Sequence, residues 1–289
     1  MRNAVLSIEP DRRYHDLSDT RRTLLNLGSG LVEDVRGDEG RGFSADFQIA
    51  LPYRGLFVWQ VGDDEIVGDP NQVLFVKGGE AYRVKTRGFA ELIITPHDEV
   101  VSELKMATHP LFRRRAFRAD PHLQSFRTRF LHWARDADPD PLRAEELMLK
   151  LLRAAMQQDD RRGQSCGATT ARLIRRTKEI LQAQLSERIR LTDVARSVGA
   201  SPAYLTDLFT RVEGLSLHQY LTRLRLAHAL VELPHTDDLT TLALDLGFSS
   251  HSHFTYAFRR GFGCTPSEFR KGVRPSLFTF STARRESEK

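Results

Sequence analysis

The chain has 289 residues, of which 40% are hydrophobic and 28% charged, a balance typical of globular proteins and unlike that of disordered or fibrous chains. No apolar run approaches the roughly 18 residues of a membrane-spanning helix, and the N-terminus lacks the apolar stretch of a secretory signal. The two cysteines are too few for a disulfide framework or a cysteine-based zinc cluster. We therefore expect a cytoplasmic protein of two ordinary domains, with no membrane contact.

The surplus of basic residues lies entirely in the C-terminal part of the chain. Residues 171–289 contain 18 basic and 12 acidic residues, whereas the first 170 contain 25 and 26. Such an asymmetry is typical of a nucleic-acid-binding domain joined to a neutral partner domain. A mildly basic surface with no nucleic-acid role would give the same numbers, so charge alone leaves both interpretations open.

Residues 1 to about 105 have the pattern of short β-strands. Apolar runs such as Leu56–Val61 and Val73–Val76 alternate with turn residues, which favours an antiparallel sandwich or barrel. From residue 110 to 158 the spacing of apolar residues becomes helical. Residues 159–170 have no periodicity and are interpreted as an interdomain linker.

The C-terminal part contains an internal repeat. Residues 191–220 match residues 239–269, at an offset of 48 up to the first glycine and of 49 after it. Each copy has a helix ended by a glycine, a capping serine that opens a second helix, and a capping box that opens a third. One copy alone could be a helical hairpin with no DNA role. Two copies joined by one helix, Leu217 to Leu233, favour a pair of helix-turn-helix units that read DNA.

Residues 242–270 resemble the signature of the AraC/XylS family of bacterial transcription regulators. They contain a Gly-Phe turn, Phe-Arg-Arg at the end of the second helix, and then Gly-x-Thr-Pro-x-x-Phe-Arg. The resemblance extends over roughly residues 171–271. It implies a seven-helix reader that inserts recognition helices 202–212 and 251–261 into successive major grooves. It also implies an N-terminal domain, often a cupin-like barrel, that senses a ligand or dimerises.

The expected architecture is α+β, with an N-terminal antiparallel β-barrel (cupin-like) plus helices and a C-terminal all-α tandem helix-turn-helix domain. The expected boundaries are an effector-binding or dimerisation domain over 1–158 with its helical part at 110–158, a linker over 159–170, an AraC-type DNA-binding domain over 171–274 and a tail over 275–289. The expected partners are double-stranded DNA, a small-molecule effector, RNA polymerase and a second copy of the chain. We expect no cofactor.

The resemblance also assigns DNA-contacting residues. The family's base-contacting positions fall on Ala203, Thr206, Asp207, Ser252, Thr255 and Tyr256, and Arg211, His251, His253 and Arg259 share the same exposed sides. Asp207 has two interpretations, as an acceptor from cytosine or as the partner of Arg211 one turn later. We expect phosphate contacts from Arg172, Arg175, Arg196, Arg211, Arg259 and Arg260.

A metal-dependent cupin enzyme with an appended DNA reader is the alternative interpretation. In such enzymes a His-x-His and a nearby Glu converge with a further His. Here the matching turn contains Glu80 but no histidine, and His15, His97 and His109 are scattered. A first-row metal needs three or more convergent ligands, so we predict no metal site and no enzyme. A third interpretation is a regulator whose barrel only dimerises.

Two further signals favour ordinary roles. His251 and His253 are two residues apart on a predicted helix and point in different directions, which favours a DNA-facing role or simple exposure over a metal pair. Tyr53, Trp59 and Tyr82 could line a pocket, but packing in the core is the favoured interpretation of each.

Overall fold

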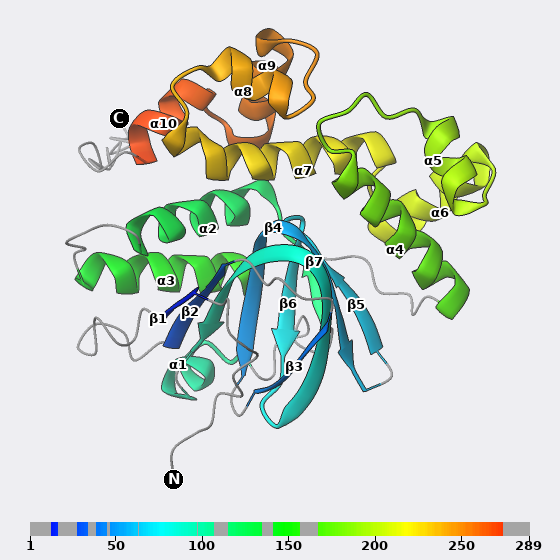
Figure 1. Cartoon of the computed structure of the whole chain (residues 1–289). Helices are drawn as coiled ribbons and strands as arrows, with labels where there is room; N and C mark the ends of the chain where they lie inside the picture. Colours follow the sequence, from blue (N-terminus) through cyan, green and yellow to red (C-terminus); the bar gives the residue numbers. More distant parts are fainter. Residues whose placement is uncertain are drawn as a thin grey trace, which may run out of the picture.

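The computed structural model of the chain describes residues 13–16, 28–33, 39–44, 47–62, 64–96, 98–106, 115–134, 141–156 and 167–273. Within these ranges a curled sheet is covered by two helices, and a string of further helices follows it in the chain (Figure 1). No helix in the same ranges is long and apolar enough to span a membrane.

The N-terminal part is built on one antiparallel sheet. Its strand order is β1-β2-β7-β4-β6-β8, with β3 paired to β7 and β5 paired to β4. The strands are β1 (Arg13–Asp16), β2 (Gly28–Glu33), β3 (Glu39–Ser44), β4 (Gln48–Val61), β5 (Asp64–Gly68), β6 (Gln72–Val76), β7 (Glu80–Thr95) and β8 (Ala116–Arg118). The sheet curls into a half-barrel, as Figure 1 shows. The predicted fold class, antiparallel strands followed by helices, is confirmed.

Three helices accompany the sheet: α1 (Asp98–Glu103), α2 (Pro121–Ala134) and α3 (Pro141–Met156). Two predictions for this region were wrong in detail. Helix α1 lies where strands were expected, and strand β8 lies within the 110–158 segment that was expected to be helical. Strand β8 pairs with β6 and buries Phe117, which is 1% exposed. A strand of three residues, of which only Ala116 and Phe117 are apolar, is too short to have a periodicity that separates it from a helix.

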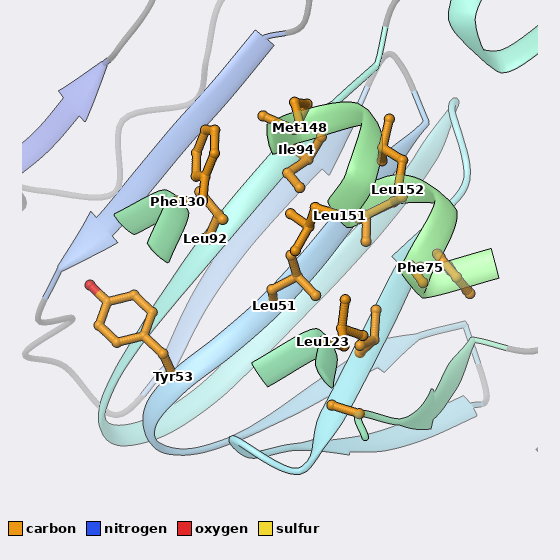
Figure 2. Close-up of a cluster of buried hydrophobic side chains, with 14 of the residues drawn as sticks. Leu51, Tyr53, Phe75, Leu92, Ile94, Leu123, Phe130, Met148, Leu151 and Leu152 are labelled. Carbon is orange, nitrogen blue, oxygen red and sulfur yellow. The ribbon is translucent and has the colours of Figure 1, made fainter. Parts of the chain in front are cut away.

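Side chains alternate between the two faces of the sheet. On β6, Val73 and Phe75 join the core beneath α2 and α3, whereas Leu74 and Val76 join the core on the opposite face. Figure 2 shows the first core, in which strand residues such as Leu51 meet the side chains of α3. The three aromatic residues expected in the core pack there. Tyr53 belongs to the core on the α2–α3 face of the sheet, whereas Trp59 and Tyr82 pack in the core on the opposite face.

The C-terminal part has seven α-helices within its described residues. They are α4 (Ala168–Ala183), α5 (Leu191–Val198), α6 (Pro202–Glu213), α7 (Leu217–Glu232), α8 (Leu239–Asp245), α9 (His251–Phe262) and α10 (Pro266–Val273). A short 3-10 helix, Leu233–His235, follows α7. Two apolar cores form, one among α4 to α7 and one among α7 to α10. Helix α7 contributes Tyr220 to the first core and Leu230 to the second, so this single helix joins two helix-turn-helix units.

The local signals for helix ends are confirmed. The Ser201 hydroxyl accepts a hydrogen bond from the Tyr204 N–H at 3.2 Å, and Ser250 does the same at α9. Both predicted capping boxes form, at the starts of α7 and α10. Gly199 and Gly247 have φ of 70° and 80°, the left-handed conformation that favours glycine after a helix.

Candidate nucleic-acid interface

The predicted DNA readers on α6 lie opposite its buried face. The buried apolar residues of the helix are Leu205, Leu208 and Phe209. Of the predicted readers, Ala203, Asp207 and Arg211 are exposed and Thr206 is half-buried. The Thr206 hydroxyl donates to the Pro202 carbonyl at 2.8 Å, which orients its methyl group. Helix α6 therefore presents a short, polar face to solvent.

Asp207 and Arg211 contact each other across one turn of α6. The Arg211 NH2 lies 3.6 Å from the Asp207 Oδ2, and both side chains are more than half exposed. Of the two interpretations of Asp207, the pairing with Arg211 is the one that the unbound chain adopts. Exposed pairs of this kind contribute about 0–1 kcal/mol, so DNA can replace the contact at little cost.

The predicted readers on α9 form the corresponding face of the second unit. The side chains of His251, Ser252, His253, Tyr256 and Arg259 are exposed, and Thr255 is half-buried. The two histidines contact different neighbours. His253 Nδ1 lies 3.1 Å from the Ser249 hydroxyl and its ring packs edge-on against Phe248, whereas His251 Nε2 lies 3.5 Å from the Thr255 hydroxyl. Among the described residues, no three histidine, cysteine, aspartate or glutamate side chains are grouped as a metal site would require.

The arginines predicted to contact phosphate differ in their exposure and in their ion pairs. Arg172, Arg196 and Arg260 are exposed. Arg196 pairs with Asp193 on its own helix, at 3.3 Å. Arg175 instead reaches the N-terminal domain, where its NH1 lies 3.0 Å from both carboxylate oxygens of Glu65. The Glu65 carboxylate therefore competes with DNA phosphate for Arg175, and the predicted phosphate contact of this residue is untested.

Two exposed residues of α6 were missing from the predicted set. Thr210 lies one turn after Asp207 and two turns after Ala203 on the same face and occupies the repeat position of Arg259. Tyr204, which is 51% exposed, lies on the flank of the helix near its N-terminus. Helical periodicity alone identifies Thr210, because positions 203, 207 and 210 share one face.

Known proteins match the C-terminal part of the chain in sequence. Residues 194–272 match the family model described as a helix-turn-helix domain. The regulatory protein PocR of Salmonella typhimurium is 35% identical over 94 residues, which is 32% of this chain and 31% of PocR. The transcriptional regulator ExsA of Pseudomonas aeruginosa is 37% identical over 84 residues, or 29% and 30% of the two chains. The match thus spans about a third of the length of these relatives.

The C-terminal domain belongs to the AraC/XylS helix-turn-helix family. The resemblance inferred from residues 242–270 is confirmed by this match.

Among solved structures, the AraC/XylS domain is similar to an AraC-type DNA-binding domain from Chromobacterium violaceum, with 28% identity, coverage of 38% of this chain and 100% of that one, and a TM-score of 0.35. ToxT from Vibrio cholerae, in a structure described as bound to an unsaturated fatty acid, is 12% identical over 86% of this chain and 96% of its own, with a TM-score of 0.36.

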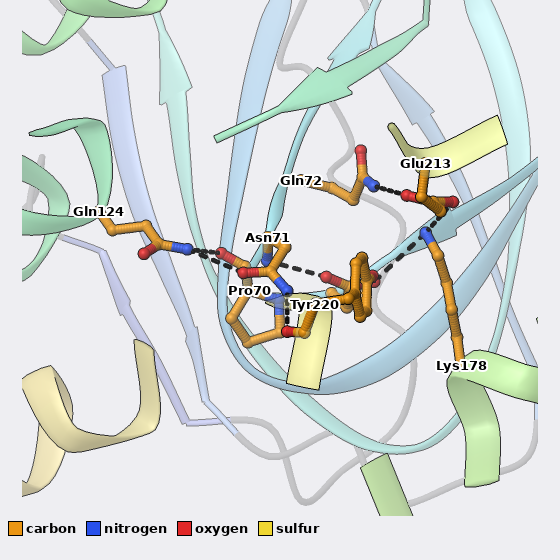
Figure 3. Close-up of polar contacts among 8 residues, drawn as sticks. Pro70, Asn71, Gln72, Gln124, Lys178, Glu213 and Tyr220 are labelled. Carbon is orange, nitrogen blue, oxygen red and sulfur yellow. Dashed lines mark hydrogen bonds and ion pairs between the residues drawn. The ribbon is translucent and has the colours of Figure 1, made fainter. Parts of the chain in front are cut away.

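A buried polar junction connects the AraC/XylS domain to the N-terminal domain (Figure 3). At its centre, the Lys178 Nζ of α4 lies 2.9 Å from Glu213 of α6 and 3.5 Å from Asp69, in the turn before β6. The Tyr220 hydroxyl of α7 donates to the Asp69 carboxylate. The side chains of these four residues are almost completely buried. The sequence patterns described above do not predict this junction.

The surrounding residues complete the hydrogen bonding of this junction. The Gln72 Nε2 donates to Glu213 at 3.3 Å, and the Asn71 Nδ2 donates to the Tyr220 carbonyl at 3.3 Å. Burial raises the pKa of Asp69 above its usual value, although Lys178 and Tyr220 oppose that rise. Burial alone would lower the pKa of Lys178, but Glu213 and Asp69 outweigh it and raise that pKa. Lys178 therefore stays charged between its two carboxylates.

Proposed function

We propose that the protein is a sequence-specific DNA-binding transcription regulator that inserts α6 and α9 into successive major grooves. The observation that carries the proposal is the pair of capped recognition helices, each with an exposed polar face, attached to the two ends of α7. With 16 residues, α7 has a length of about 24 Å. Successive major grooves on one side of a duplex are about 34 Å apart, a separation that two helices packed beyond the ends of α7 can reach.

A selection experiment tests this function. The full-length chain is used to enrich random-sequence duplexes, and the affinity for an enriched duplex is then compared with that for a scrambled one across a salt series. We expect two short preferred segments about one helical turn apart and an affinity that falls steeply with salt. Binding without sequence preference, or without salt dependence, would contradict the proposal.

We further propose that the N-terminal domain binds a small-molecule effector and that its helices α2 and α3 pair two subunits. The bound effector would then change how the regulator acts on RNA polymerase. The family resemblance supports the effector, and Leu142, an apolar side chain exposed at the start of α3, supports the pairing. A thermal-shift screen of metabolites tests the effector, because a ligand that binds only the folded state raises the melting temperature. Sedimentation of the wild type and of Leu142→Glu tests the pairing.

A further inference from the structure

The two copies of the helix-turn-helix repeat differ at two positions that are polar in the first copy and aromatic in the second. At the repeat offset of 49, Glu213 corresponds to Phe262, and Tyr220 corresponds to Phe269. In the second copy both phenylalanines belong to its own core: the Phe262 ring packs 4.6 Å from Phe258, and the Phe269 ring 5.8 Å from it. The repeat therefore needs only apolar side chains at these positions.

In the first copy the same two positions contact the N-terminal domain. The Glu213 carboxylate accepts from Gln72, and the Tyr220 hydroxyl donates to Asp69. The ring of Tyr220 still packs edge-on against Phe209, at 5.2 Å, as an aromatic at this position of the repeat would. The Tyr220 hydroxyl and one Glu213 carboxylate oxygen, which the second copy lacks, thus face the N-terminal domain, and the other Glu213 oxygen pairs with Lys178 of α4.

These contacts hold the C-terminal end of recognition helix α6. Glu213 is the last residue of the helix, and its carbonyl accepts a hydrogen bond from the Arg118 NH1 of β8 at 3.4 Å. The last carbonyls of a helix have no partner within it and carry partial negative charge, so a guanidinium at this end is favourable. Gln72 and Arg118 therefore fix the end of α6 from the N-terminal domain.

The N-terminal domain touches the second unit differently. There α2 packs beside recognition helix α9, and the Arg129 guanidinium of α2 lies 5.8 Å from the ring centre of Phe269 on α10. A contact between a cation and a ring is worth about 0.5–2 kcal/mol and constrains position less than a set of directed hydrogen bonds.

We propose that the N-terminal domain positions recognition helix α6 through Glu213 and Tyr220, so that base discrimination by α6 depends on Asp69 and Gln72 whereas discrimination by α9 does not. This inference rests on the proposed DNA-binding function. Ala203 and Thr206 lie toward the N-terminal end of α6, which is fixed at its C-terminal end. A small rotation at Glu213 therefore moves Ala203 and Thr206 relative to the base edges.

The test compares base preferences at the two half-sites in full-length variants. Random-sequence duplexes are selected with the wild type, and Thr206→Ala and Tyr256→Ala identify the base pairs read by α6 and by α9. Tyr220→Phe then gives the first copy the ring of the second and removes only one hydroxyl. Asp69→Asn and Gln72→Ala alter the other side of the junction. Asp64→Asn is the matched control, because Asp64 pairs with Arg115 inside the N-terminal domain.

At the base pairs read by α6, we expect base discrimination to fall about threefold to tenfold in Tyr220→Phe, Asp69→Asn and Gln72→Ala. At the base pairs read by α9, the discrimination of these variants should stay within about twofold of the wild type. The Asp64→Asn control should stay within about twofold at both half-sites. Equal losses at both half-sites, no loss at either, or sharper discrimination by α6 would each overturn the inference. If Asp69→Asn does not fold, Tyr220→Phe decides the question, since it keeps the buried ring.

The outcomes also separate this inference from the function on which it rests. A wild type without any base preference would overturn both. A wild type with two preferred half-sites, whose profile Tyr220→Phe leaves intact, would overturn only the positioning of α6. Arg129→Gln provides the reciprocal comparison and is expected to leave the α6 profile unchanged.

Discussion

Arg175 on α4 forms an ion pair with Glu65 on β5, in which one guanidinium nitrogen lies 3.0 Å from both carboxylate oxygens. The charge of Arg175 is thus already paired in the free protein, whereas Arg260 is exposed on α9. We expect Arg260→Ala to reduce the slope of log affinity against log salt concentration by about 1, the effect of one lost phosphate contact, and Arg175→Ala to change it little.

Fluorescence anisotropy with one labelled duplex over a salt series measures these slopes. Glu65→Gln is the companion variant, because it leaves Arg175 charged but without this partner, and a steeper salt slope is expected. If Arg175→Ala and Arg260→Ala reduced the slope equally, DNA would have to displace Glu65 from Arg175, and the pair would not persist in the complex.

Tyr256 is the most exposed of the large apolar side chains on the recognition helices, at 65%. Tyr256→Ala should therefore cost little stability but about 1–3 kcal/mol of discrimination at one base position. Competition binding against duplexes that differ at single positions measures the loss. Leu244→Ala, which removes an exposed apolar side chain from α8, is the control and should bind all duplexes as the wild type does. A uniform loss on every duplex would assign Tyr256 to the backbone of DNA and not to a base.

Gly247 and Gly199 occupy corresponding positions in the repeat but have different surroundings. A Cβ at Gly247 would lie 2.6 Å from the Arg225 guanidinium and 2.9 Å from the Leu185 carbonyl, whereas a Cβ at Gly199 would have no atom within 4 Å. Gly199→Ala should cost about 1–2 kcal/mol from its left-handed backbone, and Gly247→Ala about 1–3 kcal/mol more from the steric conflict.

The extra cost at Gly247 has a specific origin. Arg225 donates to the Leu185 carbonyl at 2.8 Å and to the Glu187 carbonyl at 2.7 Å, so a methyl group there would displace a side chain that connects α7 to the end of α4. Urea unfolding of both variants measures the difference. Equal midpoints for the two alanine variants would show that Arg225 moves aside without cost.

His228 on α7 should make the protein less stable in mild acid. Burial, together with the nearby charges of Arg54 and Arg127, lowers the pKa of His228 from 6.5 to about 4. Between these values the unfolded chain binds a proton that the folded chain does not, so stability is fully present above pH 6.5 and falls as the pH drops toward 4, by up to about 3 kcal/mol.

Urea unfolding at about pH 7 and about pH 5 measures this dependence, with His228→Gln as the comparison. The raised pKa of Asp69 has the opposite sign, because a carboxyl whose pKa is raised on folding favours the folded state as the pH falls. Only the difference between the wild type and His228→Gln therefore reports on His228. The same loss on acidification in both proteins would contradict the assignment.

The features predicted correctly from the sequence are those that neighbouring residues decide. The capping serines, the capping boxes and the glycine ends of α5 and α8 each depend on side chains within a few positions, and all of them form. The recognition helices extend only one residue beyond the predicted 202–212 and 251–261. The predicted readers, which the family resemblance assigned, also lie on exposed or half-buried positions of α6 and α9.

The junction between the domains was not predictable in the same way. Asp69 and Lys178 are more than a hundred positions apart, and no spacing in the sequence indicates that they meet. A signal was nevertheless present, because Glu213 and Tyr220 are polar where the repeat has phenylalanine. A polar residue at a position that the repeat keeps apolar indicates a contact outside the repeat.

Helix α7 joins two units that are alike in fold, and the N-terminal domain meets their recognition helices differently: Gln72 and Arg118 form hydrogen bonds with Glu213 at the end of α6, whereas α2 packs beside α9. The protein therefore has a direction along DNA, from the half-site of α6 to that of α9. Two chains bound to inverted sites would have their N-terminal domains either adjacent at the centre or at the two outer ends. Two chains bound to direct repeats would have both N-terminal domains in the same orientation. A symmetric pairing through α3 fits only the inverted arrangement with adjacent N-terminal domains, so the layout of the target sites decides whether two bound chains can pair.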